Sequence, residues 1–169
     1  MKHPLFNLIK DKHLFQSLAR VHGTPLYIYD KKQLIQNVIK INRILGKYFK
    51  KYRICYTIKA NSNPSLIRIL KSQITQLGAD CSSPGELYAA SLGDISYDKC
   101  LYTGNYESEE DLKIALNKNV HINLDDITSF EKIKKYTIPN EISFRLNPGF
   151  GKGAFSQIIT GGVDSKFGV

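Results

Sequence analysis

The sequence lacks the cysteine and histidine patterns that hold metal ions or disulfide frameworks. It has three cysteines, an odd number without CxxC spacing: Cys55, Cys81 and Cys100. None of its four histidines stands at the spacing of a metal-ligand set. We therefore expect no metal site and no disulfide framework, and we interpret the cysteines as packing residues.

The sequence also lacks a long apolar run. No stretch approaches the roughly 18 apolar residues that a membrane-spanning helix needs. The first residues, MKHPLFNLIKDKHLF, are interrupted by charge and have no apolar signal-peptide core. With 42% hydrophobic and 23% charged residues, the chain of 169 residues is typical of a globular domain with its own core. These features predict a cytoplasmic location and no membrane partner.

Nucleic-acid recognition motifs are missing as well, although the formal net charge is +9. The lysines are scattered along the chain, and the longest basic runs are short, as at Lys31-Lys32 and Lys50-Lys51. We interpret the charge as a solvated basic surface and expect no nucleic-acid partner.

What the sequence does contain is an alternation of short strands and helices. A helix is predicted over residues 31–49, where apolar residues recur at three- and four-residue steps: Leu34, Val38, Ile41, Leu45 and Phe49. The stretch TPLYIYD, residues 24–30, predicts a short strand before it. Further on, polar residues mark the ends of predicted strands at intervals of 21 to 23 residues: Lys59, Asp80, Thr103, Asp125 and Asn147.

Helix start signals follow these strand ends. The predicted caps are Asn63 before Pro64, Ser83 in the capping box Ser-Pro-Gly-Glu, Ser108 before three carboxylates, and Asp126. Glu86 closes the capping box, and we interpret it, like Ser83, as a capping residue and not a catalytic one.

Alternation without hairpin signals predicts an α/β fold with parallel strands joined by helical crossovers. An open doubly wound sheet and a (β/α)8 barrel both fit, and the absence of GxGxxG after the first strand favours the barrel. The residues from Arg145 onward hold six of the twelve glycines, and then the sequence ends. A complete barrel takes about 250 residues, so we expect residues 31–169 to form an incomplete barrel, about five of eight strands.

Lys59 is the candidate catalytic residue. A lysine at the carboxyl end of a barrel strand opens into the catalytic mouth, where partial desolvation favours the neutral amine that attacks carbonyl groups. Such an amine serves aldolases that form a Schiff base with substrate, and enzymes that hold pyridoxal phosphate. A lysine that only reaches solvent is the third interpretation, so position alone leaves the role open.

The residues around Lys59 resemble one family. YTIKANSNP resembles the Tyr-x-x-Lys-Ala-Asn signature of fold-type III pyridoxal phosphate enzymes, and KANSNP is most similar to the diaminopimelate decarboxylases. The other motifs stand in that family's order and at its spacing: TPLYIYD, GADCSSPGELYAA, TGNYESEEDLKIAL, INLDD and RLNPG…ITGG…SKFG.

The resemblance implies a partial TIM barrel of the alanine racemase-like type over residues 31–169 and the start of a β-rich second domain in residues 1–30. It implies that Lys59 carries pyridoxal 5'-phosphate as an aldimine, with Asp80 and Arg145 beside the cofactor. The implied activity is decarboxylation of an amino acid, meso-2,6-diaminopimelate, to L-lysine by a homodimer, the last step of lysine biosynthesis.

Alternatives stay open for each of these roles. A helix cap or a solvated strand end is the other interpretation of Asp80, and a structural ion pair is that of Arg145. A decarboxylase of the same fold acting on ornithine, arginine or carboxynorspermidine is the alternative activity. A non-catalytic pyridoxal phosphate-binding barrel is a further alternative.

We predict that these 169 residues alone neither decarboxylate an amino acid nor hold the cofactor tightly. An incomplete barrel exposes an open sheet edge and an apolar helix face. In relatives, the residues that hold the phosphate and stack on the cofactor ring follow later in the chain. Titration of the isolated piece with pyridoxal phosphate, followed by absorbance and carbon dioxide release, checks this prediction. Tight stoichiometric binding with turnover would contradict it.

Overall fold

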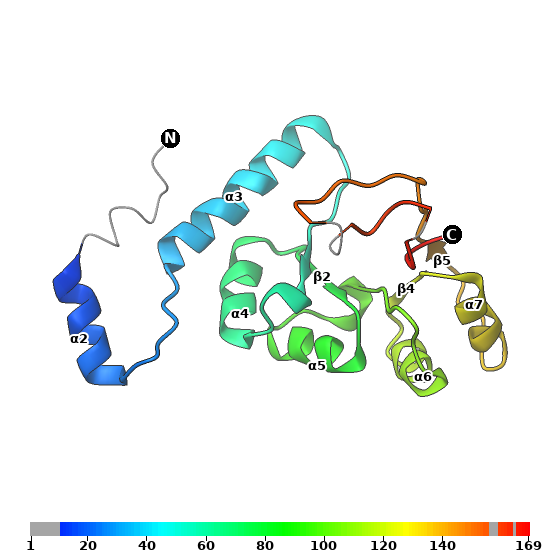
Figure 1. Cartoon of the computed structure of the whole chain (residues 1–169), viewed down its shortest axis with the longest axis horizontal. Helices are drawn as coiled ribbons and strands as arrows, with labels where there is room; N and C mark the ends of the chain where they lie inside the picture. The colour runs from blue at the N-terminus through cyan, green and yellow to red at the C-terminus, as the bar shows by residue number, and fades with distance from the viewer. Residues whose placement is uncertain (1–10, 156–158, 164) are drawn as a thin grey trace.

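The structure is a computed structural model that describes residues 11–155, 159–163 and 165–169. Two helices, α2 (Lys12–His22) and α3 (Lys31–Tyr48), precede a unit in which strands and helices alternate (Figure 1). The strands are β1 (Cys55–Thr57), β2 (Gly78–Cys81), β3 (Cys100–Tyr102), β4 (His121–Leu124) and β5 (Ile142–Phe144). The remaining helices are α4 (Pro64–Gln73), α5 (Pro84–Leu92), α6 (Glu109–Asn117) and α7 (Ile127–Lys134), with 3-10 turns η1 (Ile58–Ala60) and η2 (Tyr97–Lys99).

The five strands are all parallel and form one sheet in the order β1-β2-β3-β4-β5. Each strand thus lies beside the next strand of the chain, and a helix connects each neighbouring pair. An open doubly wound sheet reverses its strand order at a switch point, and this sheet does not. The order is that of consecutive units of a barrel, and it brings the carboxyl ends of the strands to one rim.

The two faces of the sheet differ in chemistry, because side chains alternate along a strand. One set packs under the helices and is buried: Ala79, Cys81, Cys100, Tyr102, Ile122 and Leu124. Helix residues such as Ile67, Leu87 and Ile133 complete this core. The set on the inner face includes half-buried polar residues: Thr57, Asp80, Asn123 and Ser143. The core therefore lies between the sheet and its helices, and the inner face is left for polar contacts.

The predicted helix caps are confirmed. The side chains of Asn63, Ser83, Ser108 and Asp126 accept hydrogen bonds from backbone N–H groups in the first turns of α4, α5, α6 and α7. The capping box differs in one bond. The Glu86 carboxylate accepts from the N–H and the hydroxyl of Ser82, at 2.7 and 3.1 Å, instead of from the N–H of Ser83. Glu86 therefore stabilises the turn between β2 and α5.

The segment before α3 differs from its prediction. Residues 24–30 form no strand, because a strand needs a hydrogen-bonded partner and no described strand lies beside them. The Tyr29 hydroxyl instead accepts a hydrogen bond from Asn61 Nδ2 at 3.0 Å. Helix α2, capped by Asp11, had no counterpart among the predicted elements. Of the predicted segment 1–30, residues 1–10 lie outside the described residues.

Helix α3 confirms the helix predicted over residues 31–49. It begins after Asp30, whose carboxylate accepts from Gln33 N at 3.0 Å. Val38 is buried and Leu34 packs against the core, whereas Ile41 is 50% exposed. The predicted apolar face is therefore covered only in part by the described residues.

Within the described ranges, no helix combines the length and the apolar character that crossing a membrane requires. The same residues contain no group of three or more His, Cys, Asp or Glu side chains able to hold a metal ion.

Gly93 follows α5 at a point with no space for a side chain. A Cβ here would lie 2.2 Å from Ile67 Cγ2 of α4. We predict that Gly93→Ala lowers the free energy of unfolding of the intact protein by about 1–3 kcal/mol, because a packed core resists an added carbon. Gly85, in the first turn of α5, is the matched control, since the nearest atom to a Cβ there is Ser83 Oγ at 3.8 Å.

Gly85→Ala should leave the free energy of unfolding unchanged or raise it by about 0.5–1 kcal/mol, because alanine favours a helix. Urea denaturation followed by circular dichroism measures both variants. Equal unfolding midpoints for the two would contradict the close packing of α4 against α5.

Candidate active site

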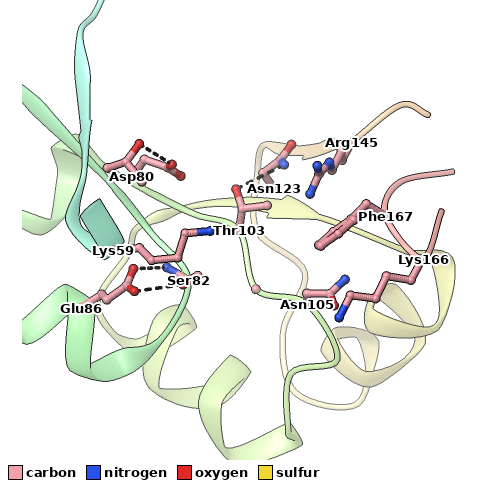
Figure 2. Close-up of a pocket in the computed structure, with 12 residues that line it drawn as sticks. Lys59, Asp80, Ser82, Glu86, Thr103, Asn105, Asn123, Arg145, Lys166 and Phe167 are labelled. Atoms are coloured by element: carbon pink, nitrogen blue, oxygen red, sulfur yellow. Dashed lines mark hydrogen bonds between the residues drawn. The ribbon is translucent and has the colours of Figure 1, made fainter. Parts of the chain in front are cut away.

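A cavity of about 590 Å³ opens at the rim formed by the carboxyl ends of the strands (Figure 2). Residues within or just after each of the five strands line it. Lys166 and Phe167, from the end of the described chain, complete the lining. Its side chains are mostly polar or charged: Thr57, Lys59, Asp80, Ser82, Glu86, Thr103, Asn105, Asn123, Arg145 and Lys166, with Phe167 as the aromatic member. This volume lies within the range of pockets that bind small molecules and cofactors.

Lys59 lies on the turn η1, directly after β1, which confirms its predicted place at the carboxyl end of the strand. Ile58 anchors the turn because it is wholly buried, and the Tyr56 hydroxyl donates to the Asn61 carbonyl at 3.0 Å. The Lys59 side chain extends into the cavity (Figure 2). It is exposed, so the expected partial desolvation is not provided by the described residues.

Asp80 is the third residue of β2 and lies beside Thr57 of β1. The Thr57 hydroxyl donates to Asp80 Oδ2 at 3.1 Å, which orients the carboxylate at the cavity wall. The interpretation of Asp80 as a helix cap is wrong, because the cap of α5 is Ser83. A role beside the cofactor stays a prediction.

Arg145 follows β5 and lines the cavity, but its guanidinium is already engaged. Arg145 Nη1 donates to Asp125 Oδ1 at 3.2 Å, and the Asp125 side chain is 1% exposed. Asn105 donates to the other oxygen of this carboxylate. The Phe167 ring centroid lies 4.5 Å from the guanidinium carbon. The structural ion pair is therefore present, and cofactor binding by Arg145 stays a prediction.

The segment after β5 returns to the rim and adds Lys166 and Phe167, which the sequence analysis missed. Gly168 allows this return, since its φ of +78° is one that side-chain-bearing residues rarely adopt. Val169 then pairs in parallel fashion with the residues after β5, through two backbone hydrogen bonds of 2.9 and 2.8 Å. The motif SKFG contains a cation, an aromatic residue and a glycine, but the sequence alone does not show that Lys166 and Phe167 reach the cavity.

The cysteines lie away from the cavity chemistry. A hydrogen bond with Cys100, together with burial, raises the pKa of the Cys81 thiol, and burial raises the pKa of the Cys55 thiol. Cys81 and Cys100 are wholly buried on the helix-facing side of the sheet. All three thiols are free, in agreement with the prediction of packing residues without a disulfide framework.

Residues 33–169 match the family model described as the pyridoxal binding domain of pyridoxal-dependent decarboxylase. The chain belongs to this family. Curated relatives include the diaminopimelate decarboxylases of Thermoplasma acidophilum, 38% identical over 90% of this chain and 36% of the relative, and of Methanothermobacter thermautotrophicus, 37% identical over 90% and 35%. The chain thus spans little more than a third of the length of these relatives.

Solved structures agree with this family. The diaminopimelate decarboxylase from Helicobacter pylori complexed with L-lysine matches with a TM-score of 0.80 at 31% identity, over 92% of this chain and 40% of that chain. The match confirms the predicted barrel of the alanine racemase-like, fold-type III decarboxylases. The family description also confirms the predicted cofactor, pyridoxal phosphate.

The cavity of this pyridoxal binding domain fits pyridoxal phosphate. Lys59 brings a primary amine into the cavity, and among the described residues this amine forms no ion pair. Lys166 adds a further cation at the wall, besides Lys59 and Arg145, which suits an anionic group such as a phosphate. The role of Lys59 as the residue that holds the cofactor stays a prediction.

We predict that borohydride reduction of the intact protein, loaded with pyridoxal phosphate, places the pyridoxyl group on Lys59. Lys166 is the other lysine of the cavity, but its Nζ lies over the rings of Tyr106 and Phe167, 5.6 and 5.2 Å from their centroids. Lys59→Arg should abolish the label and Lys166→Arg should retain it, as measured by peptide mapping. A label on Lys166 in the unmodified protein would overturn the assignment.

Proposed function

We propose that the intact protein removes carbon dioxide from meso-2,6-diaminopimelate to give L-lysine, with pyridoxal phosphate as cofactor. The observation that carries this proposal is Lys59, which opens into the rim cavity of a pyridoxal-binding domain. Relatives named diaminopimelate decarboxylase support it, at 28 to 38% identity over about nine tenths of the chain or more. One such relative is complexed with L-lysine, the product proposed here.

Lys59 would hold the cofactor through Nζ, and its amine would also hold a proton near the reacting carbon. The bound cofactor supplies the electron sink that stabilises the negative charge left by the loss of carbon dioxide. Asp80, oriented by Thr57, presents a carboxylate that attracts a positively charged group of the cofactor or substrate. Strand β1, which carries Thr57, therefore also shapes the site.

Arg145 is proposed to lie beside the cofactor as a cation. A guanidinium has five N–H donors, and among the described residues the bond to Asp125 uses one of them. The others remain for an anionic group of the cofactor or for a substrate carboxylate. The ion pair with Asp125 and the ring of Phe167 then keep the guanidinium in place.

A decarboxylase of ornithine, arginine or carboxynorspermidine is the alternative within the same fold. The lysine/ornithine decarboxylase of Vibrio vulnificus matches with a TM-score of 0.65 at 22% identity, and the arginine decarboxylase of Paramecium bursaria Chlorella virus with 0.65 at 18%. At these identities the likeness shows the fold alone. The higher identity to diaminopimelate decarboxylases favours the first proposal over these and over a non-catalytic pyridoxal phosphate-binding barrel.

The assembly of the intact protein is also proposed. Helix α2 and residues 24–30 stand apart from the sheet (Figure 1), and Val21 and Tyr27 are 75% and 88% exposed. We propose that residues 1–30 contribute to a β-rich second domain, which covers such side chains. The working form is proposed to be a homodimer in the cytoplasm.

We predict that the intact protein releases carbon dioxide from meso-diaminopimelate and forms L-lysine, and releases none from ornithine or arginine. Lys59→Ala should lower the rate at least about 10²–10⁴-fold, because it removes both the attachment point and a proton-transfer group. Lys47→Ala is the control, since Lys47 is exposed on α3, and it should retain the full rate. Turnover of ornithine or arginine without turnover of meso-diaminopimelate would leave only the family and the fold standing.

A further inference from the structure

A row of hydrogen-bonded polar side chains crosses the inner face of the sheet and ends at the cavity. His121 Nε2 lies 3.0 Å from Ser143 Oγ, which donates to Asn123 Oδ1 at 2.7 Å. Asn123 Nδ2 donates in turn to Thr103 Oγ1 at 3.3 Å (Figure 2). Asn123 and Ser143 are register partners on β4 and β5, and all four side chains are half-buried.

The number of available protons fixes the direction of this row. Ser143 Oγ has one proton and gives it to Asn123, so its bond with His121 uses a proton carried by His121 Nε2. Thr103 Oγ1 accepts from Asn123 and therefore keeps its own proton. No described residue accepts that proton or the second proton of the Asn123 amide. The row thus presents two unused donors at its cavity end.

Among the described residues, the carboxylates of the cavity accept hydrogen bonds from other groups and not from these two donors. Thr103 and Asn123 line the same cavity as Lys59. Asp80 already accepts from Thr57, and Glu86 already accepts from the backbone and hydroxyl before α5. A ligand oxygen is therefore the acceptor that two unused donors at this wall would bind.

We propose that Thr103 and Asn123 bind an oxygen of the cofactor or of the substrate carboxylate, and that Ser143 and His121 are positioning residues for this pair. The inference rests on the proposed function, because that function supplies the two ligands. A threonine hydroxyl rotates and a side-chain amide can turn over, so each could otherwise present the wrong group. The row removes this freedom and orients both donors before the ligand arrives.

Thr103→Val tests the contact, because it removes the hydroxyl and keeps the branched shape, and Thr103→Ser is the matched control that keeps the hydroxyl. Titration of the apoenzyme with pyridoxal phosphate, followed by absorbance, gives the cofactor Kd. Carbon dioxide release at saturating cofactor gives KM and kcat for meso-diaminopimelate. If the oxygen belongs to the cofactor, Thr103→Val should raise Kd roughly 10- to 100-fold and leave KM unchanged. If it belongs to the substrate, KM should rise by this factor and Kd should stay.

Both results support the proposal and identify the source of the oxygen. Unchanged Kd and KM in Thr103→Val, relative to Thr103→Ser and the unmodified enzyme, overturn the proposal and leave the proposed function intact. An unmodified enzyme that neither binds pyridoxal phosphate nor releases carbon dioxide overturns both. The two failures are therefore distinguishable.

His121 tests positioning, because it is the first residue of β4 and lies at the opposite end of the strand from the rim. His121→Leu removes the donor. It should raise whichever constant Thr103→Val raises, the cofactor Kd or the substrate KM, about 2- to 10-fold. His121→Gln returns an N–H near the position of Nε2 and should restore the constant. Melting temperatures of both variants are measured in parallel. Equal constants for the two variants, or a constant that changes only with the melting temperature, would overturn the positioning role.

Discussion

The Asp125 side chain is 1% exposed, and a buried carboxylate is stable only where opposite charge and hydrogen-bond donors reach it. Arg145, from the end of β5, and Asn105, from the loop after β3, both reach it. One side chain at the end of β4 therefore holds its two neighbouring strand ends in place. Phe167 stacks on the same guanidinium, so the segment that returns to the rim depends on this ion pair as well. Much of the cavity wall follows from satisfying a single buried charge.

Lys59 shows the opposite arrangement, an exposed side chain on a well-anchored turn. Its neighbour Ile58 is wholly buried and the next residues are tied back by Tyr56, whereas the lysine side chain itself is exposed. A residue that is proposed to form and release a covalent bond needs this combination, because the amine must move between partners while its starting point stays constant. The wall it faces is polar but internally hydrogen-bonded, so the positions of donors and acceptors are set before any ligand binds.

Local structure could be predicted from the sequence, and contacts between residues far apart in the chain could not. The caps at Asn63, Ser83, Ser108 and Asp126 were predictable because each is a hydrogen bond within one helical turn. The strand predicted at residues 24–30 was wrong, because pairing depends on a partner that local pattern does not reveal. The motif identified Lys59 as a candidate, but the engagement of Arg145 depends on Asp125, 20 residues earlier and just after another strand. The roles of Asn105 and Asn123 could not be predicted for the same reason, because their hydrogen-bond partners lie on or after neighbouring strands.

The inner face of the sheet also constrains how this sequence can change over evolutionary time. Its polar side chains are held in pairs and rows, Thr57 with Asp80, and Asn123 with Ser143 and Thr103. Replacing one member leaves its half-buried partner without a hydrogen bond. The effects of such substitutions on stability are therefore coupled and do not add. The aliphatic contacts on the helix-facing side accept volume-conserving exchanges one at a time. We therefore expect substitutions on the helix-facing side to be largely independent of one another, and substitutions on the inner face to occur as correlated exchanges between adjacent strands.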